Sequence, residues 1–202
     1  MARNTGSKHK LCRLFGEKLC EAEKCPVVRR PYKSGVHWQK RSRVSEYGQQ
    51  LREKQKAKFI YGLMETQFRR TYQRAAKQTG VTGTRLLQLL ELRLDNVVMR
   101  LGFASTRHQA RQIVRHGFIA VNDRKVDIPS YEVKPGDAIT VRDSKIGKKY
   151  FEAVKAKLSK HKTPEWLEVD AKNMTGKVLT LPTGDMLDNR INPQLIVEHY
   201  SR

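Results

Sequence analysis

Residues 93–122 read RLDNVVMRLGFASTRHQARQIVRHGFIAVN, and this stretch decides the fold of the chain. Its first part completes a dense apolar run that ends at Gly102, which predicts a helix. Thr106, with Gln109 three residues later, forms a capping-box pattern and predicts the start of a second helix that ends at Gly117. The apolar residues that follow predict a strand, so the stretch indicates two helices leading into a sheet.

Short apolar segments downstream of this stretch predict a small antiparallel sheet, because they alternate and are separated by turn residues. A turn at Asn122-Asp123 joins the first two of these strands. A basic helix is predicted from Lys145 to Lys162. The predicted strands cover residues 118–121, 126–128, 131–133, 139–141, 166–169 and 178–181.

Two amphipathic helices are predicted upstream. Ser45 is suited to cap the first, which runs to about Tyr61 with Tyr47 and Leu51 facing inward. The second carries Phe68 and aromatic or small residues at helical spacing as far as Gly80. The cations predicted to face outward from these two helices are Arg52, Lys54, Lys56, Lys58, Arg69 and Arg70.

These elements predict an α+β chain with three parts. Residues 1–44 are expected to form a basic N-terminal arm, and residues 45–92 a helical domain. Residues 93–187 are expected to form a second domain that contains the small sheet. Asn192-Pro193 predicts a last helix, and residues 188–202 are expected to complete the helical domain.

The charge of the chain points to a polyanionic partner. The chain of 202 residues has 41 Lys and Arg against 20 Asp and Glu, a formal net charge of +21. Repulsion among the surplus positive charges opposes folding of the chain. The phosphates of a nucleic acid would compensate these charges and give strong, salt-dependent binding. No apolar run is long enough to cross a membrane, and no long basic amphipathic helix favours binding to a membrane surface. Three cysteines, an odd number, favour the reducing cytosol over a disulfide framework.

Arg107, Arg111 and Arg115 recur every four residues along the second predicted helix, opposite its apolar side. Like charges at this spacing repel one another. A solvated basic face is the ordinary interpretation of such a run. We favour RNA contact, because no acidic residue within this helix offsets the repulsion.

The N-terminal arm interleaves cations with aromatic residues, and residues 1–44 hold 12 basic and 3 acidic side chains. Two interpretations fit this pattern: a disordered basic tail, or an extended arm that becomes ordered on RNA. The aromatic residues and the cysteines favour the second. Neither paired carboxylates nor a nucleophile motif is evident along the chain, so we expect no enzymatic activity.

The chain resembles small-subunit ribosomal protein four of bacterial type. The resemblance rests on stretches such as Arg93-Leu94-Asp95-Asn96-Val97-Val98, Thr106-Arg107 with Gln109-Ala110-Arg111-Gln112, Pro129-Ser130-Tyr131 and Tyr200-Ser201-Arg202, which follow one another in order along nearly the whole chain. It implies a helical domain with an inserted alpha-L RNA-binding domain. It also implies a structural, rRNA-binding role in the small ribosomal subunit of the cytoplasm.

The resemblance further implies particular partners. They are the five-prime domain of the small-subunit rRNA, whose assembly such proteins nucleate, small-subunit ribosomal protein five in an interface that affects decoding accuracy, and messenger RNA where it enters the ribosome. With the charge pattern, it predicts the following RNA-contacting residues: Arg3, Arg29, Arg30, His37, Lys40, Arg41, Arg43, Arg52, Lys54, Lys56, Lys58, Arg69, Arg70, Arg93, Arg107, Arg111, Arg115, His116 and Asn122.

Four residues of the arm have the spacing of a metal site. His9 precedes Cys12 by three positions, and Cys20 precedes Cys25 by five. Some members of the family hold zinc here with four cysteines, and three thiolates with one imidazole are an accepted structural zinc set. The alternatives are an iron–sulfur cluster and three unrelated reduced cysteines.

Two other functions are compatible with an alpha-L domain. One is a free-standing RNA-binding module that acts in ribosome rescue or RNA regulation, but such modules are short. The other is an RNA-modifying enzyme such as a pseudouridine synthase, which needs a separate catalytic domain. The matching segments fill 202 residues and leave no room for one.

Overall fold

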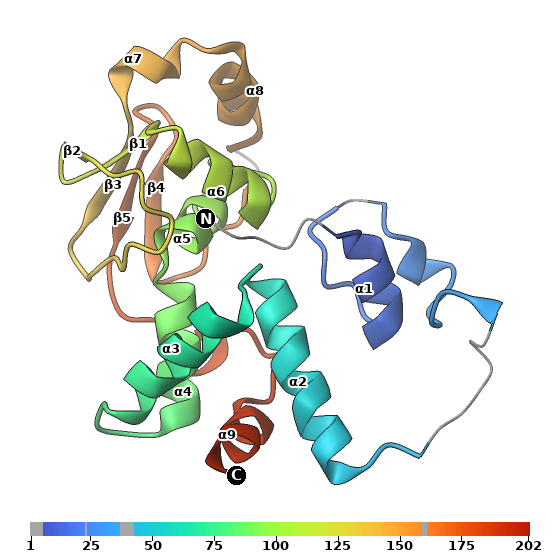
Figure 1. Ribbon diagram of the computed structural model, residues 1–202. Coiled ribbons are helices and arrows are strands. Elements are labelled where there is room, and N and C mark those ends of the chain that lie inside the picture. The colour runs from blue at the N-terminus through green and yellow to red at the C-terminus, as the bar shows by residue number, and fades with distance from the viewer. Residues whose placement is uncertain (1–5, 23, 37–42, 159–160) are drawn as a thin grey trace. The chain divides into compact units, whose positions relative to one another are not determined.

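The computed structural model describes residues 6–22, 24–36, 43–158 and 161–202. The chain divides into two compact units: Met1–Leu86 with Asn189–Arg202, and Leu87–Asp188. Helices dominate the first unit, and the second combines helices with a five-stranded antiparallel sheet (Figure 1). The predicted α+β class is therefore confirmed.

The first unit is helical. Ser45 caps α2 as predicted, because its hydroxyl accepts a hydrogen bond from the Gly48 amide at 3.2 Å. Asn192 caps the last helix by accepting from the Gln194 amide at 3.0 Å. The elements are α1 (Lys8–Phe15), η1 (Pro26–Val28), α2 (Glu46–Ile60), α3 (Glu65–Ala76) and α9 (Pro193–Ser201), while α4 (Thr82–Glu91) runs from this unit into the next.

The prediction of an extended N-terminal arm is wrong for the described residues. Helix α1 forms there, and Phe15, Leu19 and Val27 are buried. The ring of Phe15 meets the ring of Phe59 edge-on at a centroid distance of 6.0 Å. These apolar side chains exclude water and fold the segment, which the strong positive charge of the region conceals in the sequence.

The inward and outward faces of α2 also differ from the prediction. Tyr47 is 51% exposed, whereas Lys54 and Lys56 are each only 7% exposed. Their ammonium groups lie 3.0 Å from Glu65 Oε1 and 2.8 Å from Glu17 Oε2, respectively. A lysine can be buried when its charge is paired, so these two residues point inward with their partners.

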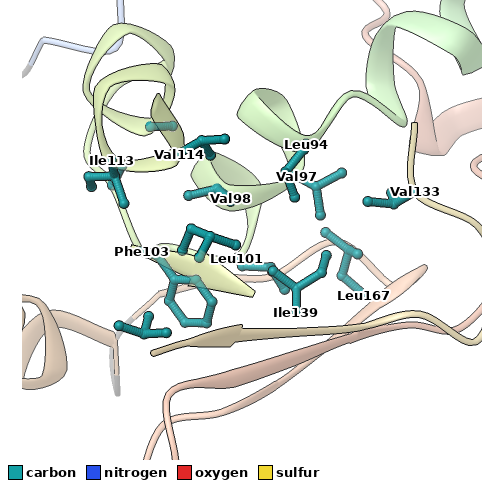
Figure 2. Close-up of a cluster of buried hydrophobic side chains, with 14 of the residues drawn as sticks. Leu94, Val97, Val98, Leu101, Phe103, Ile113, Val114, Val133, Ile139 and Leu167 are labelled. Atoms are coloured by element: carbon teal, nitrogen blue, oxygen red, sulfur yellow. The ribbon is translucent and has the colours of Figure 1, made fainter. Parts of the chain in front are cut away.

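The second unit has its core between two helices and the sheet. Val98 on α5 (Leu94–Arg100), Leu101 at the end of α5 and Val114 on α6 (Arg107–Arg115) pack toward Ile139 on the sheet (Figure 2). The sheet order is β2-β1-β3-β5-β4. Its strands are β1 (Ile119–Val121), β2 (Arg124–Lys125), β3 (Ala138–Val141), β4 (Leu167–Asp170) and β5 (Thr175–Val178), and the remaining elements are α7 (Asp143–Ile146), α8 (Lys149–Leu158) and η3 (Gly184–Met186).

Local signals at the start of this unit are confirmed. The Thr106 hydroxyl accepts from the Gln109 amide at 3.2 Å, and the Gln109 side chain accepts from the Ser105 amide at 3.0 Å. Asn122 and Asp123 have φ values of 48° and 63°, as in the tight turn of a two-residue hairpin. The start of α6 and the β1–β2 hairpin are therefore set by local sequence.

Three predicted strands are wrong in extent. Residues 126–128 are not a strand, and of residues 131–133 only Glu132 forms a bridge, to Arg93. The last predicted strand, 178–181, lies at Thr175–Val178 instead. A Cβ on Gly176 would stand 2.5 Å from the Leu101 side chain, so a glycine at this position is what lets β5 approach Leu101.

Candidate nucleic-acid interface

Several cations of the second unit are buried and paired with acidic or polar side chains. Arg93 donates two hydrogen bonds to Asp95, from Nε to Oδ1 at 3.1 Å and from Nη2 to Oδ2 at 2.8 Å. Arg111 Nη1 lies 3.8 Å from the same Asp95 Oδ2. One buried carboxylate therefore holds two arginines from two different parts of the chain.

A second carboxylate, Glu91, is completely buried and is satisfied in the same way. It accepts from Asn96 Nδ2 at 2.6 Å and from Arg100 Nη2 at 2.8 Å. Asn96 in turn accepts from Arg107 Nε at 2.8 Å. Arg107 is only 6% exposed, so its role in this structure is to join α6 to α5.

The predicted arginine stripe on α6 is therefore wrong. Of its three members only Arg115 is exposed; Arg107 is buried and Arg111 is largely covered. The charge of Arg111 is offset by Asp95, and Arg107 is held by Asn96; both partners belong to α5 and not to α6. The expectation that nothing internal compensates these charges failed because the compensating acid lies on another helix.

Exposed cations of the second unit surround the end of α6 and the hairpin. Arg115 ends α6, and Arg124 and Lys125 form the exposed strand β2. Asn122, predicted to contact RNA, donates to Asp137 Oδ1 at 2.8 Å and accepts from the Ala138 amide at 2.9 Å. The contacts of Asn122 thus brace the hairpin that presents these cations.

The first unit also has exposed cations. Arg69 and Arg70 are exposed on α3, as predicted, and Arg43 is exposed before α2. The outward positions predicted for Lys54 and Lys56 are wrong, because both ammonium groups are buried against carboxylates. Arg3, His37, Lys40 and Arg41 lie outside the described residues.

Two further cations of α2 have internal contacts as well. Arg52 Nη2 donates to the Phe15 carbonyl at 2.9 Å, and Lys58 Nζ lies 3.2 Å from Glu65 Oε2. These contacts tie α2 to the N-terminal segment and to α3. The RNA-binding roles assigned to Arg52, Lys54, Lys56 and Lys58 stay predictions.

A basic hollow of about 830 Å³ opens in the N-terminal segment. Its charged lining residues are Arg13, Lys24, Arg29 and Arg30. The sequence pattern predicted Arg29 and Arg30 as binding residues but did not single out Arg13 or Lys24. Arg13 lies beside an aromatic residue only in the folded chain, where its guanidinium is 5.2 Å from the centre of the Tyr32 ring, so the sequence carried no local signal for it.

Glu65, on α3, forms ion pairs with two lysines of α2 and a hydrogen bond with α9. Besides its two lysines, it accepts a hydrogen bond from the Tyr200 hydroxyl at 2.8 Å. Burial alone would raise the pKa of Glu65, but the hydrogen bonds from Lys54, Tyr200 and Lys58 outweigh it and lower the pKa to about 2. Glu65 therefore stays ionised and holds the last helix through Tyr200.

The histidine and cysteines of the N-terminal segment converge. The ligand atoms of His9, Cys20 and Cys25 all lie within 4.8 Å of one another, and Cys20 Sγ is 3.8 Å from His9 Nδ1. Cys12 is buried one helical turn after His9 on α1. Burial raises the pKa of Cys25, but hydrogen bonds from the Val27 amide, His9, Cys20 and Cys12 lower it to about 7.

These features define a basic nucleic-acid-binding protein: exposed cations stand on two compact units, while other cations, such as Arg93 and Lys54, are buried and paired with carboxylates. The model for the ribosomal protein S4/S9 N-terminal domain matches residues 3–91, and the model for the S4 domain matches residues 92–139. The chain therefore belongs to the small ribosomal subunit protein uS4 family.

Full-length relatives agree with this assignment. The chain is 51% identical to small ribosomal subunit protein uS4 of Caldicellulosiruptor bescii and 52% identical to that of Dictyoglomus turgidum. Each alignment covers 100% of this chain and 100% of the relative. The expected family, and with it a structural protein of the small ribosomal subunit instead of an enzyme, are confirmed. Within the described residues, no helix is long and apolar enough to cross a membrane.

Proposed function

We propose that this chain is a structural constituent of the small ribosomal subunit that binds the small-subunit rRNA through cations exposed on both units. The observation that carries the proposal is the separation of the cations into two sets. Arg93, Arg107 and Lys54 are buried and paired, whereas Arg70 and Arg115 are exposed. Only the exposed set is placed to replace counterions on phosphates.

The mode of binding follows from this arrangement. The buried ion pairs fix α5 against α6 and α2 against α3, so Arg69 and Arg70 on α3 and Arg115 on α6 are carried on rigid helices. Folded RNA presents phosphates at fixed positions, and rigid cations bind it by shape and backbone contacts more than by base sequence. The proposed phosphate-contacting residues are Arg29, Arg30, Arg43, Arg69, Arg70 and Arg115.

Three finer features of this function rest on the family. The rRNA region is the five-prime domain, where binding nucleates assembly of the subunit. The protein partner is small-subunit ribosomal protein five, whose contact with the chain influences decoding accuracy. Messenger RNA passes near the chain where it enters the ribosome. The exposed, basic surfaces of both units are compatible with all three.

The proposal also includes a structural zinc ion in the N-terminal segment. The residues fit the metal, because His9, Cys12, Cys20 and Cys25 are a three-sulfur, one-nitrogen donor set and three of their ligand atoms already lie within 4.8 Å. Zinc bound there would cross-link α1 to the segment before η1. Its contribution is folding energy, which a segment with so small a core needs.

Salt-dependent cosedimentation tests the main proposal. The full chain is mixed with small subunits depleted of their own uS4 protein, and with duplex RNA of random sequence as a competitor. We expect the chain to sediment with the subunits at high salt and to prefer rRNA over the competitor. Equal affinity for the competitor, with no cosedimentation, would contradict the proposal.

A further inference from the structure

A small pocket beside the end of α6 takes no part in the buried ion pairs of the second unit. It has a volume of about 230 Å³. This is below the roughly 300–1,000 Å³ of a typical small-molecule site, so it suits a single ring system. It is lined by Gln109, Gln112, Ile113, His116, Phe118 and Tyr150.

Aromatic rings form much of the wall of this pocket and hold one another in place. The rings of His116 and Phe118 have centroids 5.9 Å apart, and Phe118 lies 6.0 Å from the buried Phe151. The Tyr150 hydroxyl donates to the Phe103 carbonyl at 3.0 Å, which fixes that ring as well. Rigid, partly exposed aromatic rings are the surfaces on which RNA-binding domains stack unpaired bases.

Two of the pocket's polar groups are the side-chain amides of Gln109 and Gln112, which suit the edge of a base. Gln112 is exposed, and the described residues show no hydrogen bond to its side chain. The Gln109 side chain accepts from Ser105, and this contact holds the amide at the pocket. A side-chain amide offers a donor and an acceptor together, which matches the paired donors and acceptors on base edges.

The charge around the pocket favours a nucleotide over a protein side chain. Neither residues 109–118 nor residues 144–150 contain an acidic residue, and together they contain five Lys and Arg. Lys148 Nζ lies 4.5 Å and Lys145 Nζ 5.9 Å from the centre of the Phe118 ring. Positive charge next to an aromatic wall can bind the phosphate of the nucleotide whose base enters.

We infer that this pocket receives one unstacked nucleobase of the bound RNA, held by the aromatic wall of His116, Phe118 and Tyr150. The base is splayed out of a loop or bulge, and its phosphate lies toward Lys148. The inference rests on the proposed rRNA binding and adds to it a point of base contact. Phosphate contacts alone do not distinguish one nucleotide from the next. A base held in the pocket would fix which nucleotide of the RNA lies at this point of the surface.

Affinity measured at several salt concentrations distinguishes a base contact from a phosphate contact. Wild type, Gln112→Ala, His116→Ala and Lys148→Ala are titrated with small-subunit rRNA. We expect Gln112→Ala and His116→Ala to weaken binding by roughly ten-fold with the salt slope unchanged, because stacking and edge contacts release no counterions. Lys148→Ala should reduce the slope by about 0.7–0.9, the value for one phosphate contact.

The matched control is Gln73→Ala, which removes an exposed glutamine from α3, and circular dichroism verifies that each variant folds. In parallel, the wild-type complex is irradiated with ultraviolet light and digested. A nucleotide cross-linked to Phe118, His116 or Tyr150 supports the inference.

Wild-type affinity in both pocket variants, with no cross-link at these residues, would overturn the inference while leaving the proposed rRNA binding intact. If both pocket variants kept wild-type affinity and a protein, not RNA, were cross-linked at the pocket in whole subunits, the inference would also be overturned. The occupant of the pocket would then be a protein side chain. Failure of the wild-type chain itself to prefer rRNA would instead overturn the proposed function and, with it, the inference.

Discussion

Arg107 Nε donates a 2.8 Å hydrogen bond to Asn96 Oδ1, and this contact joins α6 to α5 in the second unit. Asn96 passes the connection on, because its Nδ2 donates to both the backbone and the side chain of Glu91, at 2.8 and 2.6 Å. Arg100 then neutralises Glu91. The result is a chain of polar contacts through a region that is otherwise apolar, in which each member depends on the next.

The first prediction concerns this network. Arg107→Ala should lower the free energy of unfolding by about 2–4 kcal/mol, because Asn96 and its neighbours lose a buried charged partner. Arg115→Ala, on the exposed end of the same helix, should change it by less than about 0.5 kcal/mol. Urea unfolding followed by circular dichroism measures both. Equal stability of the two variants would show that the network does not hold α6.

Local signals made part of this unit predictable from the sequence. The Thr106 cap and the Asn122-Asp123 turn depend on residues within a few positions, so their patterns sufficed. The burial of Arg107 could not be predicted in this way, since its partner Asn96 lies on another helix. Spacing within one helix shows which side chains share a face but not what that face meets.

The same limit explains the errors in the first unit. Lys54 has the pattern of an exposed cation until Glu65 of the next helix is brought against it. The cluster of His9 with Cys20 and Cys25 could be predicted, because donor types and spacing carry that signal directly. The nucleobase pocket could not, since Phe118 and Tyr150 lie 32 positions apart in the sequence.

The second prediction concerns the exposed cations. Replacing Arg69, Arg70 and Arg115 together by alanine should weaken rRNA binding at all RNA sequences. It should lower the salt slope by about 2–3, at 0.7–0.9 for each phosphate that is no longer neutralised. The control is Lys172→Ala, which removes an exposed cation from the nearly neutral last quarter of the chain. Filter binding at several salt concentrations gives the slopes. If the triple variant kept the wild-type salt slope, these three arginines would not contact phosphates of the rRNA.

The third prediction follows from the pKa of Glu65, which is lowered from 4.5 to about 2 in the folded chain. A carboxyl group with a lowered folded pKa stabilises the fold above its unfolded pKa, and this stabilisation is lost as the pH falls toward the folded pKa. Glu65→Gln should therefore reduce stability at pH 6 more than at pH 2.5.

The expected difference is about 1 kcal/mol, less than the full shift implies, because the side chain is 44% exposed and solvent screens its ion pairs. Urea midpoints of wild type and variant at the two pH values measure it. Glu198→Gln is the control, since Glu198 on α9 accepts a hydrogen bond from the neutral Gln50 side chain at 3.1 Å and has no lysine partner within the described residues. A Glu65→Gln effect that did not change with pH would assign the destabilisation to packing alone.

The fourth prediction concerns the metal. Protein purified without chelator should contain about one zinc per chain, because three thiolates and one imidazole complete a tetrahedral site. His9→Cys should retain the metal, since four thiolates are an equally good set, whereas Cys20→Ser should lose it. Elemental analysis measures the content. Substitution by cobalt gives an independent readout, because thiolate ligands produce a charge-transfer absorption that Cys20→Ser should weaken.

Removal of the metal should then destabilise the N-terminal segment. A chelator should lower the melting temperature of wild type by about 2–8 °C, the shift that 1–2 kcal/mol produces in a chain of this size. The chelator should leave Cys20→Ser unchanged, which separates loss of the site from general effects of the reagent. Wild-type protein that contained neither zinc nor iron, and melted at the same temperature with and without chelator, would leave Cys12, Cys20 and Cys25 as buried thiols that stabilise α1 by packing alone.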